Sequence, residues 1–195
     1  MALRIKTKWH RSKRSERNTA GSSKPKTVED LAGVIAFNIW KISQETYRRM
    51  EKEEFSFTED KQVTDIITEV IAFLVHVADR MVYGKLENED RSRFVTSLAK
   101  ELGKTLDCNM LDLFGKGDYI TPFYNTLNER FSDYAEFEFE GNEPSYAAKR
   151  YLGDKISGIM KVSDNKWVLE QVMDIEAPEA IKIMQRLMTD VVGLK

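Results

Sequence analysis

The chain has 195 residues, of which 42% are hydrophobic and 32% are charged, and its net charge is −2. This length and composition exclude a wholly disordered chain and are typical of one domain with a core that needs no disulfide or metal. The longest apolar run, Val70–Val75, is far shorter than the roughly 20 residues of a membrane-spanning helix. The charge is unevenly distributed: residues 1–26 carry nine basic residues and one acidic residue (+8), and residues 27–195 carry 21 basic and 31 acidic residues (−10).

Residues 1–26 are predicted to form a flexible basic arm and linker ahead of a helical domain over 27–195. The segment has few apolar side chains and ends in a Gly-, Ser- and Pro-containing stretch, so burial cannot offset the entropy of ordering it. Clustered bases around an aromatic ring can bind a nucleic acid, and they equally suit an anionic lipid surface or an acidic protein groove. A solvated tail that aids solubility is the alternative. The candidate anion-binding residues are Arg4, Lys6, Lys8, Trp9, Arg11, Lys13, Arg14 and Arg17.

The cysteine content and the start of the chain bear on its compartment. Cys108 is the only cysteine, so no disulfide forms within the chain, which favours a reducing compartment. The first residues are basic but lack the apolar segment of a secretory signal. We therefore expect a cytoplasmic protein, while the basic, serine-containing start leaves organellar import open.

The spacing of apolar residues predicts an all-α fold, a single bundle of six to seven helices around a central apolar helix. The first helix begins at Thr27, which forms a capping box with Asp30, and extends to about Glu53. The second helix is capped by Thr58 and ends near Gly84. Because the second helix is apolar nearly all round, we expect it to occupy the centre of the bundle.

The third helix is predicted to begin after Asn88, and Gly103 is expected to kink it or to divide it in two. Its buried stripe recurs every four residues and consists of Phe94, Leu98, Leu102, Leu106 and Met110. The fourth helix is predicted to begin at Thr121-Pro122, a cap followed by proline at the first helical position. Its buried stripe consists of Phe123, Leu127, Phe131 and Tyr134.

The last third of the chain is predicted to contain shorter elements. Residues 136–140 alternate between acidic and aromatic side chains, so a short strand competes there with the frayed end of the fourth helix. Three shorter helices should follow near 145–160, 164–175 and 178–192, with Pro178 opening the last.

Polar residues on the second helix form the candidate site. Glu69, His76 and Arg80 share one line of the helix with Asp65 and Tyr83, and Asp79 lies beside His76. One hypothesis is a buried acid–base or ligand-binding site around His76. The alternative, which we favour, is a structural hydrogen-bond network in which His76 is buried and bonded to Asp79 or Arg80.

The sequence predicts neither a metal site nor a cofactor. A di-iron bundle needs Glu-x-x-His motifs, but Phe73 stands three residues before His76. Cys108 has no basic neighbour to lower its pKa, which argues against a catalytic thiolate. We therefore expect a non-enzymatic interaction or assembly protein with a protein partner, whose arm engages an anionic partner such as nucleic acid. The sequence also allows a homo-oligomer, and the competing hypothesis is a small enzyme or ligand-binding protein that uses Glu69, His76, Asp79 and Arg80.

Overall fold

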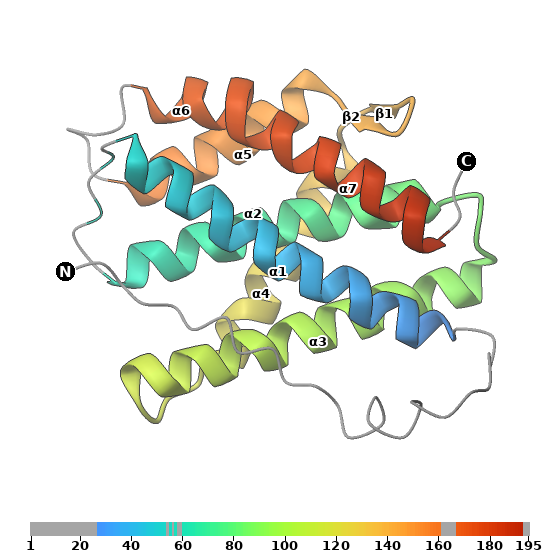
Figure 1. Ribbon diagram of the computed structural model, residues 1–195, viewed down its shortest axis with the longest axis horizontal. Helices are drawn as coiled ribbons and strands as arrows, with labels where there is room; N and C mark the ends of the chain where they lie inside the picture. The colour runs from blue at the N-terminus through green and yellow to red at the C-terminus, as the bar shows by residue number, and fades with distance from the viewer. Residues whose placement is uncertain (1–26, 54, 56, 58–59, 161–166, 193–195) are drawn as a thin grey trace.

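The computed structural model describes residues 27–53, 55, 57, 60–160 and 167–192. Its helices form one all-α bundle, which confirms the predicted fold class (Figure 1). The helices are α1 (Val28–Lys52), α2 (Asp60–Val82), α3 (Asn88–Phe114), α4 (Ile120–Ala135), α5 (Tyr146–Ile159), α6 (Val168–Gln171) and α7 (Ala177–Val192). The predicted arm, residues 1–26, and the predicted cap Thr58 lie outside the described residues.

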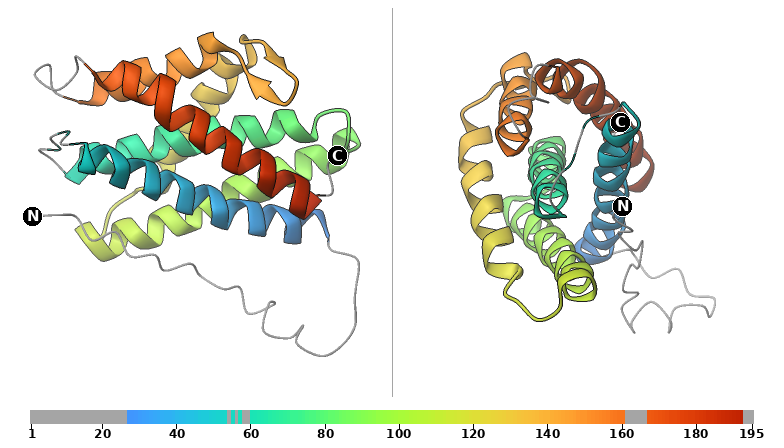
Figure 2. Two further views of the ribbon diagram at one scale, coloured as in Figure 1. Left: turned by 45° about the horizontal axis from the view of Figure 1, so that its top comes forward. Right: turned by 90° about the vertical axis from the view of Figure 1, so that its left-hand side faces the viewer.

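Helix α2 occupies the centre of the bundle, as its apolar composition predicts. It packs against α1, α3, α4, α5 and α7, and the end-on view in Figure 2 shows the other helices arranged around it. Every residue from Ile66 to Asp79 is buried. A helix that is apolar on all sides can hide that surface only by lying inside the bundle.

Helix α1 begins with the predicted capping box and then lies along α3. Thr27 Oγ1 accepts a hydrogen bond from the Asp30 N–H at 3.1 Å, and Asp30 accepts one from the Thr27 N–H at 3.2 Å. Arg93, in the second turn of α3, contacts the Glu29 carboxylate at 2.7 Å. The start of α1 and the start of α3 are therefore neighbours.

Helix α3 continues through Gly103, so the predicted division of the helix there is wrong. Gly103 is buried, and a Cβ at this position would lie 2.7 Å from Tyr124 Oη of α4. The glycine thus provides room for close contact between α3 and α4 rather than a helix break. Three of the four predicted core residues of α4 are buried, and Phe131 is half-buried against the core.

Helix α4 begins at Ile120, slightly before the predicted start at Thr121-Pro122. Thr121 does not act as the cap, because Asp118 Oδ1 accepts a hydrogen bond from the Thr121 N–H at 3.0 Å. The aspartate lies three residues before this N–H, which is the usual reach of a capping side chain. Sequence reasoning therefore identified the start of the helix within one residue, but Thr121 lies inside the helix and does not cap it.

The ambiguous segment 136–140 contains both the end of a helix and a strand. Helix α4 ends at Ala135, and β1 (Phe139–Glu140) then pairs antiparallel with β2 (Glu143–Pro144). The intervening Gly141 and Asn142 have φ angles of 58° and 64°, as a two-residue type I′ hairpin turn requires.

The predicted break between the last two helices is wrong. A π-helical turn, Val172–Glu176, joins α6 to α7, and the Ala177 N–H donates to the Val172 carbonyl five residues back. This turn directly precedes Pro178, which lacks an N–H and disfavours a regular α-helix around it. The buried Glu176 carboxylate in the turn accepts a hydrogen bond from Arg49 Nε of α1 at 2.8 Å and forms an ion pair with Arg49 Nη2 at 2.7 Å.

Two glycines of α5 provide a matched test of how closely it packs on α6. A Cβ at the buried Gly153 would lie 2.7 Å from Leu169 Cδ1 and 3.2 Å from the Leu169 carbonyl oxygen, whereas one at Gly158 would meet nothing within 4 Å. We expect Gly153→Ala to destabilise the protein, because overpacking costs about 1–3 kcal/mol and exceeds the roughly 1 kcal/mol that alanine gains over glycine in a helix. Gly158→Ala should be neutral or stabilising. Urea denaturation measures both, and equal effects would contradict the close approach at Gly153.

Candidate functional site

The polar residues that share one side of α2 contact different neighbouring elements in the structure. Glu69 is bound to α4, and Asp79 to the first turn of α3. Asp65 is half-buried at the surface and pairs with Lys61 of its own helix at 2.5 Å. Tyr83, at the other end of the line, is 56% exposed. Helical spacing placed these residues on one side of α2, but the neighbouring helices separate them into different contacts.

Glu69 forms a buried, bidentate ion pair with Arg130 of α4. Arg130 Nε lies 2.8 Å from Glu69 Oε2, and Arg130 Nη2 lies 2.9 Å from Oε1. The same guanidinium contacts Glu129 at 2.6 Å and Asp133 at 3.3 Å. Burial disfavours its charge, but the hydrogen bonds to Glu69 and Glu129 outweigh burial and raise the pKa of Arg130.

The ion pair continues as a network to α5. The Tyr151 hydroxyl of α5 donates a hydrogen bond to the Asp133 carboxylate, which is itself bound to Arg130. Burial, together with this hydrogen bond, raises the pKa of Tyr151. The network therefore links α2, α4 and α5 through buried and half-buried polar groups.

His76 lies in an aromatic enclosure. It is 3% exposed and stacks on Tyr134 with ring centroids 5.4 Å apart, while the edges of Phe131 and Phe139 lie 5.9 and 6.4 Å away. His76 Nδ1 and the Tyr134 hydroxyl have no hydrogen-bond partner among the described residues. The predicted burial of His76 is thus confirmed, whereas its predicted hydrogen bonding is wrong for Nδ1. Burial lowers the pKa of His76 to about 4, so the imidazole is neutral at neutral pH.

Asp79 and Arg80 point to different neighbours. Asp79 accepts two hydrogen bonds from Arg91 of α3, from Nε at 2.7 Å and from Nη2 at 2.5 Å. The Arg80 guanidinium lies over the rings of Tyr83 and Phe139, at 5.2 and 5.8 Å from their centroids. The Arg91 guanidinium also lies over the Tyr83 ring, 4.8 Å from its centroid. These contacts join the end of α2 to α3 and to the hairpin.

This arrangement is poorly suited to acid–base catalysis. A general base must come within hydrogen-bond reach of a substrate, but His76 is enclosed by rings, and the carboxylates of Glu69 and Asp79 are engaged by arginines. Burial, with Asp107 and Asp112 nearby, raises the pKa of the Cys108 thiol. Within the described ranges, no three histidine, cysteine or acidic side chains are grouped to hold a metal ion. None of the helices in the described part is long and apolar enough to cross a membrane.

Sequence reasoning missed the residues that complete these contacts. Arg130 lies on the buried face of α4, three residues after Leu127 and four before Tyr134, so its position in the stripe was a usable signal. A lone arginine on such a face indicates a buried acidic partner. Arg91 is half-buried in the first turn of α3 and carries no comparable signal.

The structure also contains a cavity that the sequence does not predict. It lies where α2, the end of α3 and the start of α4 meet, and its volume is about 370 Å³. Phe114, beside this cavity, is 41% exposed. None of Glu69, His76, Asp79 and Arg80 lines it.

The remaining candidate residues, Arg4 to Arg17 of the arm, lie outside the described residues. No protein-family model matches the sequence, no curated protein matches it at a significant level, and no solved structure matches the fold at that level. Function is therefore inferred from the residues of this chain and their geometry.

Proposed function

We propose that this chain is a non-enzymatic helical interaction protein whose basic arm, residues 1–26, engages an anionic partner. The observation that carries the proposal is the difference in charge balance between the helical domain and the arm. Glu69 and Asp79 of the central helix are held by Arg130 and Arg91 inside the bundle, whereas the arm has nine bases and one acid of its own. Attraction between a basic arm and a polyanion gives fast, salt-dependent association. A cytoplasmic location, a protein partner for the bundle and self-association remain part of this proposal.

The surroundings of His76 support this proposal over the competing one. A small enzyme or ligand-binding protein that used Glu69, His76, Asp79 and Arg80 would need a cavity that these residues share. His76 instead packs against three aromatic rings, and the cavity beside α3 is lined by other residues.

Replacing the eight basic residues of the arm between Arg4 and Lys24 by glutamine in the full chain tests the proposal. We expect the parent to bind single-stranded DNA, with log K falling against log[salt] at a slope of about −0.7 for each phosphate neutralised. The glutamine variant should lose this binding. Its melting temperature should change by no more than a few degrees, because the arm has few apolar side chains to add to the core.

A second full-length variant, in which eight exposed bases of the helical domain become glutamine, is the control for net charge. It should keep most of the DNA binding. Vesicles of anionic lipid and an acidic peptide, tested in parallel, distinguish the class of anion. If the arm variant bound all three probes as tightly as the parent does, or if the parent bound none of them, the proposed role of the arm would be wrong.

A further inference from the structure

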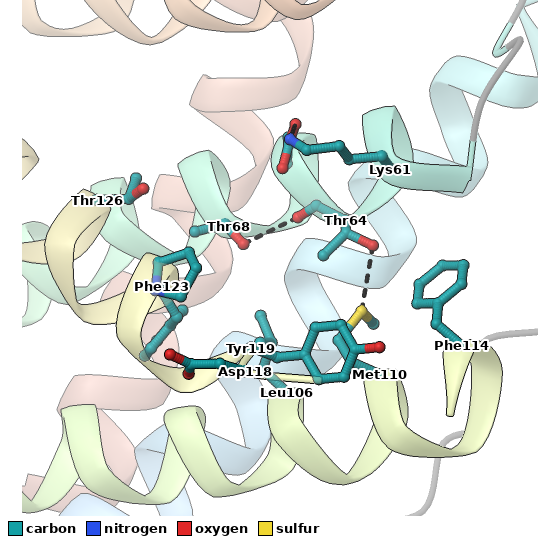
Figure 3. A pocket seen from close by; sticks show the side chains of 12 residues that line it. Lys61, Thr64, Thr68, Leu106, Met110, Phe114, Asp118, Tyr119, Phe123 and Thr126 are labelled. Carbon is teal, nitrogen blue, oxygen red and sulfur yellow. Dashed lines mark hydrogen bonds and ion pairs between the residues drawn. The ribbon is translucent and has the colours of Figure 1, made fainter. Parts of the chain in front are cut away.

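The cavity between α2, α3 and α4 has the composition of a binding site for an apolar group. Figure 3 shows aromatic and aliphatic side chains around it, with polar side chains of α2 on one side and Asp118 on the other. Its volume of about 370 Å³ falls within the range of ligand pockets, and it exceeds the roughly 150 Å³ that accommodates one benzene ring. The main apolar lining residues are Leu106, Met110, Phe114, Tyr119, Pro122 and Phe123.

The cavity follows from how α3 and α4 pack. Tyr124 of α4 lies against Gly103 of α3, and the linker at 115–119 follows the end of α3, beyond that contact. Phe114 and Leu111, in the last turn of α3, are 41% and 40% exposed. Bulky apolar side chains exposed beside a concave site are typical of a surface that another group covers.

The edge of the cavity favours a positively charged occupant. Asp65 and Asp118 line it, and Lys61, the basic residue among the lining side chains, is paired with Asp65 at 2.5 Å, so the lining keeps one net negative charge at Asp118. The carboxylate of Asp118 therefore sets the sign of the charge at this edge, and it attracts a basic group.

We propose that the indole of Trp9 from the arm of the same chain docks in this cavity. Trp9 is the aromatic residue of the arm, and Lys8 and Arg11 flank it in the sequence. An indole offers a large apolar surface for the ring- and methionine-lined wall, and the neighbouring bases match the net negative charge at Asp118. Of the segments outside the described residues, the arm alone combines an aromatic ring with a cluster of bases.

The position of the arm makes this docking geometrically feasible. The arm joins the helical domain at Thr27, beside the start of α3, where Glu29 contacts Arg93 at 2.7 Å. Met110, in the cavity wall, lies about 26 Å farther along α3 at ~1.5 Å per residue. A flexible tether of the length between Trp9 and Thr27 has an r.m.s. span of about 20–25 Å. A tether whose span matches the distance gives an effective concentration on the order of millimolar, so even weak docking is populated.

Docking would regulate the activity proposed above, and this regulatory part rests on the proposed function. A polyanion and the cavity would compete for the same segment of the arm, since the bases around Trp9 cannot be bound to both. In the absence of an anionic partner the arm would therefore lie against the helical domain. The docking itself can be tested without any polyanion.

Tryptophan fluorescence of the full chain provides that test. Trp40 is buried in α1 and Trp167 is 66% exposed, so a Trp167→Phe background removes the exposed reporter in the helical domain. The difference between this protein and its Trp9→Phe derivative then gives the emission of Trp9. We expect emission blue-shifted from that of free tryptophan, and a loss of about half or more of its acrylamide quenching, because a docked indole is shielded from water.

Two ion pairs of the same spacing supply a variant and its control. Asp65 pairs with Lys61 at the cavity, and Asp154 pairs with Arg150 on α5, each four residues apart on one helix. Asp65→Lys should shift Trp9 emission toward that of free tryptophan and restore its quenching, and Asp154→Lys should do neither. A second variant, Thr64→Phe, fills the cavity without a change of charge and should have the same effect as Asp65→Lys, with circular dichroism confirming that both variants are folded.

Each remaining outcome would overturn the docking. Solvent-like emission of Trp9 in the parent would do so, as would shielded emission that neither cavity variant changes. Shielding that increases with protein concentration would assign the docked arm to a second copy and overturn the intramolecular proposal. Failure of the chain to bind polyanions would contradict the proposed function but would leave the fluorescence result standing, so the two failures are distinguishable.

Discussion

Replacing Arg130 by methionine is expected to lower the free energy of unfolding by about 3–5 kcal/mol, because the substitution leaves a buried carboxylate without its counter-charge. Arg130 and Glu69 are both buried, and the guanidinium also contacts Glu129 and Asp133. Methionine keeps much of the apolar stem of arginine, so the loss reports the charge rather than the volume. Urea denaturation at neutral pH measures the effect.

The chain provides a matched control for this substitution. Arg93 also contacts a glutamate through two nitrogens, at 2.7 and 3.0 Å, but its pair with Glu29 is about half exposed on both sides. Arg93→Met should therefore cost much less than Arg130→Met, because solvent screens an exposed ion pair. The double variant Glu69→Leu with Arg130→Met removes both buried charges and should recover most of the stability lost in Arg130→Met. A loss in Arg130→Met as small as that in Arg93→Met would show that the buried pair does not stabilise the bundle.

Replacing His76 by alanine is expected to cost about 2–4 kcal/mol, because it leaves a cavity among the rings of Phe131, Tyr134 and Phe139. The hydrogen-bonded histidine expected from the sequence would be replaced best by glutamine, which keeps a donor and an acceptor. The structure indicates a different replacement. His76→Phe preserves the aromatic packing and removes the unpaired Nδ1, so it should retain parental stability or exceed it. Parental stability of His76→Ala would exclude a packing role for this ring.

Lowering the pH should increase the difference in stability between the parent and His76→Phe. The pKa of His76 is about 4 in the folded chain against an ordinary value of 6.5, mainly because burial disfavours the charged imidazolium. Between these two values the unfolded chain binds more protons than the folded chain, so stability decreases as the pH falls from 6.5 toward 4. A pKa shift of this size lowers the free energy of unfolding by about 3 kcal/mol once the pH has fallen to 4. The stability difference between His76→Phe and the parent should thus be constant above pH 6.5 and grow in favour of His76→Phe below it; a difference that stayed constant down to pH 4 would contradict the lowered pKa.

The local sequence pattern predicted those features of the fold that depend only on residues close together in the chain. The capping box of Thr27 and Asp30 acts within one helical turn, and the stripe from Phe94 to Met110 follows from helical periodicity, so both were recognisable in the sequence. The limits of this reasoning are equally local. Asp118 and Thr121 are residue types that can both cap a helix, and only the path of the linker before α4 places the Asp118 carboxylate at the Thr121 N–H.

The candidate site shows what a one-dimensional pattern leaves undetermined. The sequence placed Glu69, His76 and Asp79 on the central helix and predicted that polar groups there need partners. It did not identify those partners, because Arg130 is 61 residues from Glu69 along the chain, and the contact exists only once α2 and α4 pack. Arg91, by contrast, is 12 residues from Asp79, and the turn between α2 and α3 brings the two together.

By itself the sequence determined the all-α class, the central position of the apolar second helix and the separation of a basic arm from an acidic body. These properties depend on hydrophobic periodicity and composition, which can be read from short segments of the sequence. The tertiary structure decided that α6 and α7 are joined through a π-helical turn, that Gly103 accommodates Tyr124, and that a cavity opens beside Phe114. Those features depend on which surfaces face each other, and facing surfaces are set by long-range packing that no local pattern encodes.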